Sequence, residues 1–122
     1  MRTMLLAAFL TAAAALSPAL AQDAKQDFTL VNKTGYALNE AYLAPADSNE
    51  WQEDFLGKNQ LDDGDTKKIH FSPKTKTCKW DLQVVYTEDD SKVVWRNIDL
   101  CTVDRITLFY NKKTDKTSAK FD

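Results

Sequence analysis

Residues 78–101 constrain the fold more than any other part of the sequence, because they combine a regular alternation of side chains with the two cysteines of the chain. Apolar side chains stand at every second position from Cys78 to Tyr86, which is the period of a β-strand with one buried face. Turn-forming residues 88–91 follow, and residues 92–98 have a second strand pattern. This segment therefore predicts a β-hairpin.

The cysteines are symmetric about the Asp89-Asp90 bond. A hairpin folded about that bond places Cys78 opposite Cys101, and it also pairs Tyr86 with Val93, Val85 with Val94, Val84 with Trp95 and Gln83 with Arg96. Opposed residues lie about 4.5–5.5 Å apart, which suits a disulfide. Asp-Asp is a poorer turn centre than Asp-Gly, and a bulge would shift this register by one residue.

We therefore predict a structural disulfide between Cys78 and Cys101. The alternative is a catalytic or redox pair, but the spacing is not C-x-x-C and no histidine lies close in the sequence.

Residues 1–21 have the pattern of a secretory signal peptide. Arg2 precedes an apolar run over residues 4–16, and Ser17-Pro18 and Ala19-Leu20-Ala21 supply the end of the run and an A-x-A cleavage site. Cleavage after Ala21 predicts export to the periplasm or the cell exterior, where disulfides form. A membrane-spanning helix needs about 20 apolar residues, so the shorter run favours a cleaved leader, and no membrane span is expected in the mature chain.

The remaining segments predict short strands separated by turns. We expect strands over 28–32, 36–44, 66–71 and 105–110, with the first two forming a hairpin around Gly35. Residues 48–57 predict one or two helical turns, capped by Ser48 or Asn49 and ended by Gly57.

These elements predict one all-β domain over residues 28–110. Its expected architecture is a small antiparallel β-sandwich or barrel of about six strands, with at most one short helix and one disulfide. Residues 22–27 and 111–122 are polar and are expected to be a flexible N-terminus and a frayed C-terminal tail.

No complete set of catalytic or cofactor-binding residues is visible in the sequence. His70 is the single histidine, and its position between Ile69 and Phe71 predicts that it points outward from a strand. The chain has no G-x-S-x-G motif, and both thiols are expected to be paired, so a nucleophile triad and a zinc site are disfavoured. We predict no catalytic residues, no metal and no cofactor.

Two acidic turns and one sequon remain as weaker features. Asp62, Asp63 and Asp65 surround Gly64, and Asp89-Asp90 forms a second turn; such oxygen ligands suit calcium. The EF-hand pattern is absent, and acidic turns usually connect strands, so calcium is the less favoured interpretation. Residues 32–34 form a glycosylation sequon, which matters only in a eukaryotic secretory pathway.

The aromatic residue with the best claim to exposure is Trp51, because it lies outside the strand patterns. Trp80 and Trp95 are expected on the core face of the hairpin, whereas Trp51 and the nearby Asp54 form a candidate surface site. The alternative for Trp51 is packing over the end of the sandwich.

The charge pattern argues against nucleic-acid binding. The formal charge of the whole chain is −2, and loss of Arg2 with the leader brings it to −3. Positive and negative residues are interspersed, without the basic patch that a nucleic-acid binder usually shows.

The chain resembles a loosely defined set of small exported bacterial β-rich proteins of uncharacterised function. The motifs that carry this resemblance are Asn32-Lys33-Thr34-Gly35, Trp51-x-x-Asp54-x-Leu56-Gly57, Leu61-x-x-Gly64, Cys78-x-Trp80-Asp81-Leu82-x-Val84 and Asp99-Leu100-Cys101. The resemblance covers roughly residues 28–110. It implies a bacterial periplasmic or extracellular location and a β-rich fold with the same cysteine pair, and it implies no activity.

Together these features favour an exported binding or accessory module of the bacterial cell envelope, acting on a protein, peptide or glycan. One alternative is a small exported hydrolase with an acidic site; a Trp51/Asp54 pair beside a pocket, with a raised carboxyl pKa, would favour it. Another is an inhibitor of an exported enzyme, acting through a protruding loop at residues 45–60 or 72–77.

Overall fold

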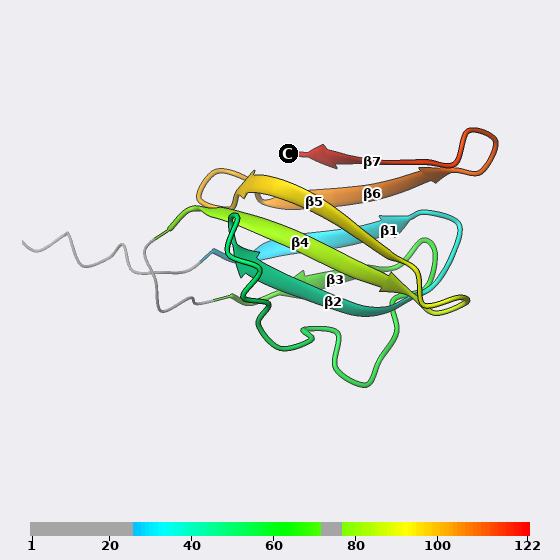
Figure 1. Cartoon of the computed structure of the whole chain (residues 1–122), viewed down its shortest axis with the longest axis horizontal. Coiled ribbons are helices and arrows are strands. Elements are labelled where there is room, and N and C mark those ends of the chain that lie inside the picture. Colours follow the sequence, from blue (N-terminus) through cyan, green and yellow to red (C-terminus); the bar gives the residue numbers. More distant parts are fainter. Residues whose placement is uncertain (1–25, 72–76) are drawn as a thin grey trace, which may run out of the picture.

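The computed structural model describes residues 26–71 and 77–122, and these residues form an all-β sandwich of two sheets (Figure 1). The strands are β1 (Phe28–Lys33), β2 (Leu38–Pro45), β3 (Thr66–Ile69), β4 (Lys79–Tyr86), β5 (Lys92–Asp99), β6 (Arg105–Asn111) and β7 (Lys116–Phe121). One sheet has the order β3-β1-β6-β7 and the other β2-β4-β5. The predicted all-β class is confirmed. In the described part of the chain, no helix has the length and apolar character needed to cross a membrane.

Strands β1 and β2 do not form the predicted hairpin, because they belong to different sheets. Strand β1 pairs antiparallel with β3 and parallel with β6, so the four-stranded sheet is mixed rather than purely antiparallel. A parallel pair needs a long crossover, and here the whole second sheet lies between β1 and β6 in the chain. The turn after β1 therefore carries the chain across the sandwich.

Asn32 fixes this turn. Its fully buried Nδ2 donates to the carbonyl oxygens of Tyr36 and Leu61 at 2.8 and 2.9 Å. Its Oδ1 accepts from the backbone and hydroxyl of Thr34 at 3.0 and 2.7 Å, and Gly35 follows at φ 89°. These bonds redirect the chain where a hairpin turn would have continued it beside β1. They also use both amide hydrogens of the sequon asparagine.

The core lies between the two sheets and includes Trp80, as predicted. Trp80 is 1% exposed, meets Phe71 edge-to-face at 4.7 Å and donates from Nε1 to the carbonyl of Thr77 at 3.2 Å. Trp95 is partly buried against the same core. Most of the other large side chains that are less than 2% exposed are aliphatic, namely Leu30, Leu38, Leu43, Leu82, Val84, Ile106 and Leu108; the two polar ones are Asn32 and Asp81.

The predicted hairpin of β4 and β5 forms, but its register is wrong. Val84 faces Val93 and Val85 faces Lys92, two residues away from the predicted pairs. The turn closes over residues 87–90: the Tyr86 amide bonds the carbonyl of Ser91 at 2.9 Å, and Asp90 has φ 61°. A shift of two residues keeps Val93 and Trp95 on the predicted core face, and the bulge opposite Asp81 then brings Ile98 onto that face, opposite Trp80.

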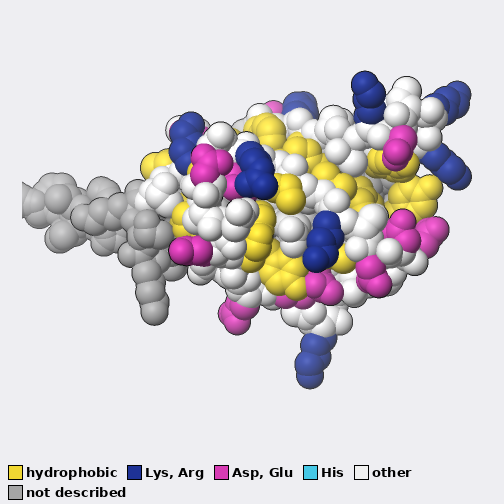
Figure 2. Space-filling view, viewed as in Figure 1, with side chains coloured by type: hydrophobic (Ala, Val, Ile, Leu, Met, Phe, Trp, Pro, Cys, Tyr) yellow, Lys and Arg dark blue, Asp and Glu magenta, His cyan; other side chains and the backbone are white. Residues whose placement is uncertain are grey.

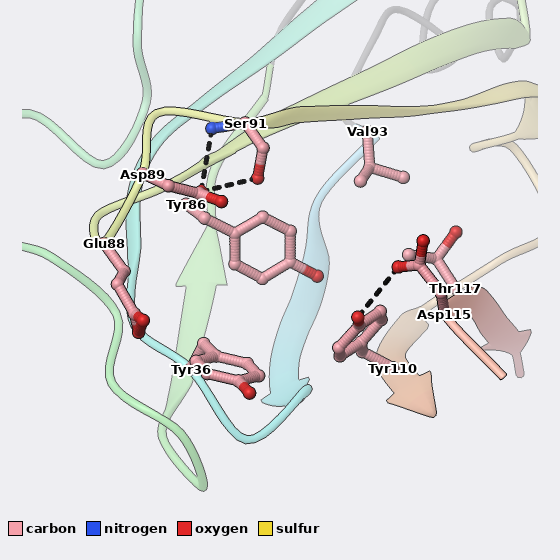
Figure 3. A pocket seen from close by; sticks show the side chains of 9 residues that line it. All are labelled: Tyr36, Tyr86, Glu88, Asp89, Ser91, Val93, Tyr110, Asp115 and Thr117. Atoms are coloured by element: carbon pink, nitrogen blue, oxygen red, sulfur yellow. Dashed lines mark hydrogen bonds between the residues drawn. The ribbon is translucent and has the colours of Figure 1, made fainter. Parts of the chain in front are cut away.

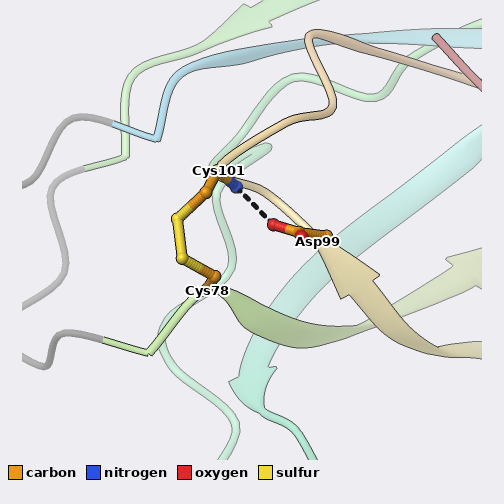
Figure 4. Close-up of side chains that lie close together, drawn as sticks. All are labelled: Cys78, Asp99 and Cys101. Carbon is orange, nitrogen blue, oxygen red and sulfur yellow. Dashed lines mark hydrogen bonds between the residues drawn. A yellow bond between two sulfur atoms is a disulfide. The ribbon is translucent and has the colours of Figure 1, made fainter.

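A bulge opposite Asp81 shifts the register again, so that Lys79 faces Asp99 at the open end. The Cys78–Cys101 disulfide is confirmed, with 5.3 Å between the Cα atoms. The ladder partner of Cys78 is Leu100, whose amide donates to the Cys78 carbonyl at 2.9 Å. Cys101 lies one residue further on, in a turn that the Asp99 carboxylate holds through the Cys101 amide at 3.0 Å (Figure 4).

The tail expected to be frayed over 111–122 is instead strand β7, which pairs with β6 along its whole length. Asp122 continues the pairing through bonds to Arg105 in both directions, at 2.9 and 3.1 Å. The pattern was hard to recognise because β7 is an edge strand: its half-buried residues, Thr117 and Ala119, are small, and Lys116 and Lys120 are of the kind that protects sheet edges.

The folded domain begins before residue 28, the predicted N-terminal boundary. Residues 22–25, like the predicted signal peptide, lie outside the described residues, but Gln26 and Asp27 are held in place rather than flexible. The Gln26 amide donates to the carbonyl of Phe71 at 2.9 Å, and Asp27 Oδ1 accepts from the Phe71 amide at 3.0 Å.

Residues 48–57 contain no helix and instead run beside the outer edge of β2. The amides of Gln52 and Phe55 donate to the carbonyls of Leu43 and Ala41 at 2.8 and 2.9 Å. Positive φ angles at Asp47 and Asn49, 63° and 56°, bend the chain back onto this edge. The edge bonds satisfy backbone groups that the helical turn would have left unpaired on β2.

Candidate functional site

A pocket of about 350 Å³ opens at the end of the sandwich where the β4–β5 and β6–β7 hairpins turn (Figures 1 and 3). We call it the tyrosine pocket. The residues that line it are Tyr36, Tyr86, Glu88, Asp89, Ser91, Val93, Tyr110, Asp115 and Thr117. Both sheets contribute, so the pocket depends on the sandwich being assembled.

Three tyrosines from distant segments meet in this pocket. Tyr36 follows the Asn32 turn, Tyr86 ends β4 and Tyr110 lies near the end of β6. The Tyr36 ring meets the rings of Tyr86 and Tyr110 edge-to-face, with centroids 6.3 and 5.9 Å apart. Such pairs hold aromatic rings in fixed relative orientations. The pocket is therefore preformed in part by ring-to-ring contacts.

The Tyr86 hydroxyl is buried without a satisfactory partner. Tyr86 is 7% exposed, and its Oη has no hydrogen-bond partner of normal geometry among the described residues. Burial raises the pKa of Tyr86, and the nearby Thr34 hydroxyl opposes that rise. The Thr34 hydroxyl is already bonded to Asn32 and Tyr36. Figure 3 shows the Tyr86 hydroxyl pointing inward, between Val93 and Tyr110.

Three carboxylates border the pocket: Glu88 and Asp89 on the β4–β5 turn, and Asp115 on the β6–β7 turn. The Tyr110 hydroxyl donates to Asp115 Oδ1 at 2.8 Å, and this bond raises the pKa of Tyr110. The Ser91 hydroxyl and amide donate to Asp89 Oδ1 at 2.7 and 3.0 Å, and these bonds lower the pKa of Asp89.

Positive side chains stand at the same end of the molecule but outside the pocket. No Lys, Arg or His is among the described residues that line it. Lys112 and Lys113 instead line an adjoining, shallow depression, which shares Tyr110 with the pocket. Figure 2 shows Lys and Arg side chains projecting from the upper part of the right-hand end, with acidic side chains both among and below them.

The predicted surface pair Trp51 and Asp54 lines neither of these depressions of the described chain. Asp54 Oδ1 accepts from the amides of Ala41 and Leu56, both at 2.9 Å, so this oxygen ties the segment to β2. Trp51 is half-buried. The pair stays a prediction as a binding site.

Asp54 lies close to a second tyrosine–carboxylate pair. The Tyr42 hydroxyl donates to Glu40, and this bond, together with burial and the charges of Glu40 and Asp54, raises the pKa of Tyr42 to about 12. This pair resembles Tyr110 and Asp115 chemically, but it lies outside the tyrosine pocket.

The acidic turns considered for calcium act within the fold. Asp63 Oδ1 accepts from the Gly35 amide at 2.8 Å, and Asp62 Oδ1 accepts from Gln60 Nε2 at 3.1 Å. Within residues 26–71 and 77–122, the one close group of three potential metal ligands is Cys78, Asp99 and Cys101, and the disulfide occupies both sulfurs.

His70 is exposed, as its strand position predicted, and its Nδ1 lies 3.2 Å from Asp27 Oδ2.

The tyrosine pocket was not predicted from the sequence. A usable indication was present in two places, where a tyrosine precedes an acidic turn: Tyr86 before Glu88 and Asp89, and Tyr110 before Asp115. Tyr36 joins them only because the chain crosses between the sheets after Asn32.

Comparison with known proteins places the chain in no family. No protein-family model matches the chain, and no curated protein has significant sequence similarity to it.

Proposed function

We propose that the protein is an exported binding module of the bacterial cell envelope, and that the tyrosine pocket holds part of its partner. The observation that carries this proposal is the Tyr86 hydroxyl, buried beside a preformed aromatic pocket without a partner of normal geometry. Buried polar groups are nearly always satisfied, so an exception beside a pocket favours a ligand-binding role. The leader pattern and the disulfide support export.

The pocket fits binding better than hydrolysis. A general acid at neutral pH needs a carboxyl whose pKa is raised. The hydrogen bonds from Ser91 lower the pKa of Asp89, which is the direction opposite to that of a general acid. The raised pKa values in the pocket belong to Tyr86 and Tyr110, which are protonated donors at neutral pH.

The inhibitor alternative has less support from the loops. Residues 50–56 lie along the edge of β2 instead of protruding, through bonds from Gln52 and Phe55. Residues 72–76, in the second loop considered, lie outside the described residues.

The test is capture from an envelope extract with the oxidised, leader-cleaved protein as bait. The pocket variant is Tyr36→Leu/Tyr110→Leu, and the matched control is Tyr42→Phe, which changes a tyrosine outside the pocket. Thermal unfolding of both variants verifies that they fold. We expect one partner to be retained by the wild type and the control and to be lost by the pocket variant. Equal retention by all three proteins would contradict the pocket assignment. Turnover in a broad hydrolase screen that the pocket variant abolishes would favour the enzyme alternative.

A further inference from the structure

We propose that the tyrosine pocket binds an organic cation, specifically an alkylammonium group. This inference rests on the proposed binding function and names the chemistry of the ligand. The same group occurs in a lysine side chain of a polypeptide and in a small free amine, and the experiment below separates these sources.

The aromatic lining is the first argument. A cation is attracted to the face of an aromatic ring, and cages of several aromatic side chains are used to recognise ammonium groups. The rings of Tyr36, Tyr86 and Tyr110 converge in one pocket, and their edge-to-face contacts leave ring faces turned toward different directions. Val93 supplies an apolar wall beside them (Figure 3). This wall suits the alkyl part of such a ligand.

The charge of the rim is the second argument. Glu88, Asp89 and Asp115 border the pocket without a lining Lys, Arg or His. The ion pairs of the described chain are His70–Asp27, Lys79–Asp99, Arg96–Asp81 and Lys120–Asp122, and none involves these three carboxylates. Their charge is therefore available to a ligand, and it selects a cation over an anion.

The Tyr86 hydroxyl is the third and independent argument. It lies at the inner side of the pocket, and its oxygen has no partner of normal geometry in the described structure. A tyrosine oxygen accepts as well as donates, so an ammonium N–H can bond to it. A carboxylate rim with a buried acceptor behind it matches a group that carries several N–H donors.

The size of the pocket limits the ligand. A volume of about 350 Å³ lies at the lower end of the range for small-molecule sites, which is about 300–1,000 Å³. It suits one long side chain or a small amine. A neutral sugar would also stack on tyrosine rings, but it would make no use of the three negative charges.

The experiment is calorimetric titration of the oxidised, leader-cleaved protein with defined probes at low and at high salt. The alkylammonium probes are Nα-acetyl-lysine methylamide, which represents a polypeptide lysine, and putrescine, which represents a free amine. The neutral probes are the Nε-acetylated form of the lysine probe and methyl glucoside. We expect saturable binding of an alkylammonium probe, weakened by salt, and no binding of the neutral probes. Tighter binding of the lysine probe indicates a polypeptide partner, and tighter binding of putrescine indicates a free amine.

Variants assign the binding to the pocket. Glu88→Gln and Asp115→Asn are expected to weaken the alkylammonium probe about threefold to tenfold each, as loss of one nearby charge does. Tyr36→Leu is expected to weaken it by a similar factor, through loss of a ring face. Glu40→Gln and Tyr42→Phe alter the matched pair outside the pocket and should leave the affinity unchanged.

Two results would overturn the inference: absence of binding by both alkylammonium probes, or equal effects of the pocket variants and the matched controls. If no alkylammonium probe binds but the pocket variant still loses its partner in the capture experiment, the proposed ligand chemistry is wrong and the proposed binding function stands. If capture is also independent of the pocket, the proposed function fails with it.

Discussion

Arg96 Nη1 lies 2.8 Å from Oδ2 of Asp81, and the Asp81 side chain is fully buried while Arg96 is half exposed. The same carboxylate accepts from the amides of Asp47 and Asn97 at 3.0 and 2.9 Å. Asn97 has φ 56° and lies in the bulge opposite Asp81. One buried carboxylate therefore joins three segments: the first part of β4, the bulge of β5 and the turn after β2.

We expect Asp81→Ala to destabilise the protein by about 3–5 kcal/mol, because the guanidinium and two amides lose their shared acceptor at a buried site. Urea unfolding monitored by tryptophan fluorescence measures the change. Lys79→Gln is the control: its pair with Asp99 is exposed, with 3.9 Å between Nζ and Oδ2, and its loss should cost less than about 1 kcal/mol. Equal losses in the two variants would contradict the role of Asp81.

The Cys78–Cys101 disulfide should contribute about 3–4 kcal/mol, on a chain-entropy estimate for a loop of this length. We expect the melting temperature to fall on addition of reductant, and to be equally low in Cys78→Ser/Cys101→Ser without it. The double serine variant should not respond to reductant. Equal melting temperatures of the oxidised and reduced wild type would contradict this prediction.

Strand β7 should behave as part of the fold. The Asp122–Arg105 bonds and the alternation of an antiparallel ladder turn the amides of Ser118 and Lys120 toward β6, so hydrogen exchange of these two amides should be slow. Removal of residues 112–122 should destabilise the domain, because β6 then becomes an edge and Ile106 and Leu108, both 0% exposed, lose their neighbour. Exchange of the Ser118 and Lys120 amides as fast as in an unstructured peptide would show that the pairing does not persist in solution.

Three of the tyrosines should ionise above the ordinary pKa of the phenol group. The chain has four tyrosines, and the pKa values of Tyr42, Tyr86 and Tyr110 are raised, that of Tyr42 to about 12. Ultraviolet titration of tyrosinate should show a step near pH 12 that disappears in Tyr42→Phe. Glu40→Gln should move this step downward, because Glu40 provides the largest cause of the shift.

The raised tyrosine pKa values determine how the free energy of unfolding changes with pH. A tyrosine whose pKa is higher in the folded than in the unfolded state binds its proton more tightly when folded. Its contribution to stability is complete below pH 10, the unfolded pKa, and is lost as the pH rises through about 12. Unfolding measured between these limits should show falling stability, and a smaller fall in Tyr42→Phe. A flat profile would contradict the shift.

Much of the sandwich could be predicted because alternation determines which side of a strand is buried. The faces of β4 and of β5 as far as Trp95 followed from the sequence, and so did the cysteine pair. The register did not, because it depends on the length of the turn after Tyr86 and on the bulge that Asp81 stabilises. The turn length leaves no mark on the alternation, and the bulge moves the core-facing positions of β5 from Val93 and Trp95 to Ile98, which a strict period of two does not predict.

The predictions that were wrong concern features that depend on contacts between residues distant in the sequence. The Asn32 amide bonds the carbonyl of Leu61, and this contact directs the chain away from a β1–β2 hairpin. The tyrosine pocket has the same origin, since Tyr36, Tyr86 and Tyr110 meet only when both sheets are in place. Trp51 and Asp54 are candidates from the sequence because Trp51 lies outside the strand patterns and Asp54 is three residues away.

The most direct test of alkylammonium binding in the tyrosine pocket is an amide-resolved NMR titration of the oxidised protein with Nα-acetyl-lysine methylamide. We expect saturable chemical-shift changes of the backbone amides of Tyr36, Tyr86, Glu88, Tyr110 and Asp115. Salt and the Glu88→Gln substitution should reduce these changes. Shifts that centre on Trp51 and Asp54, or the absence of any saturable shift, would contradict binding in the tyrosine pocket.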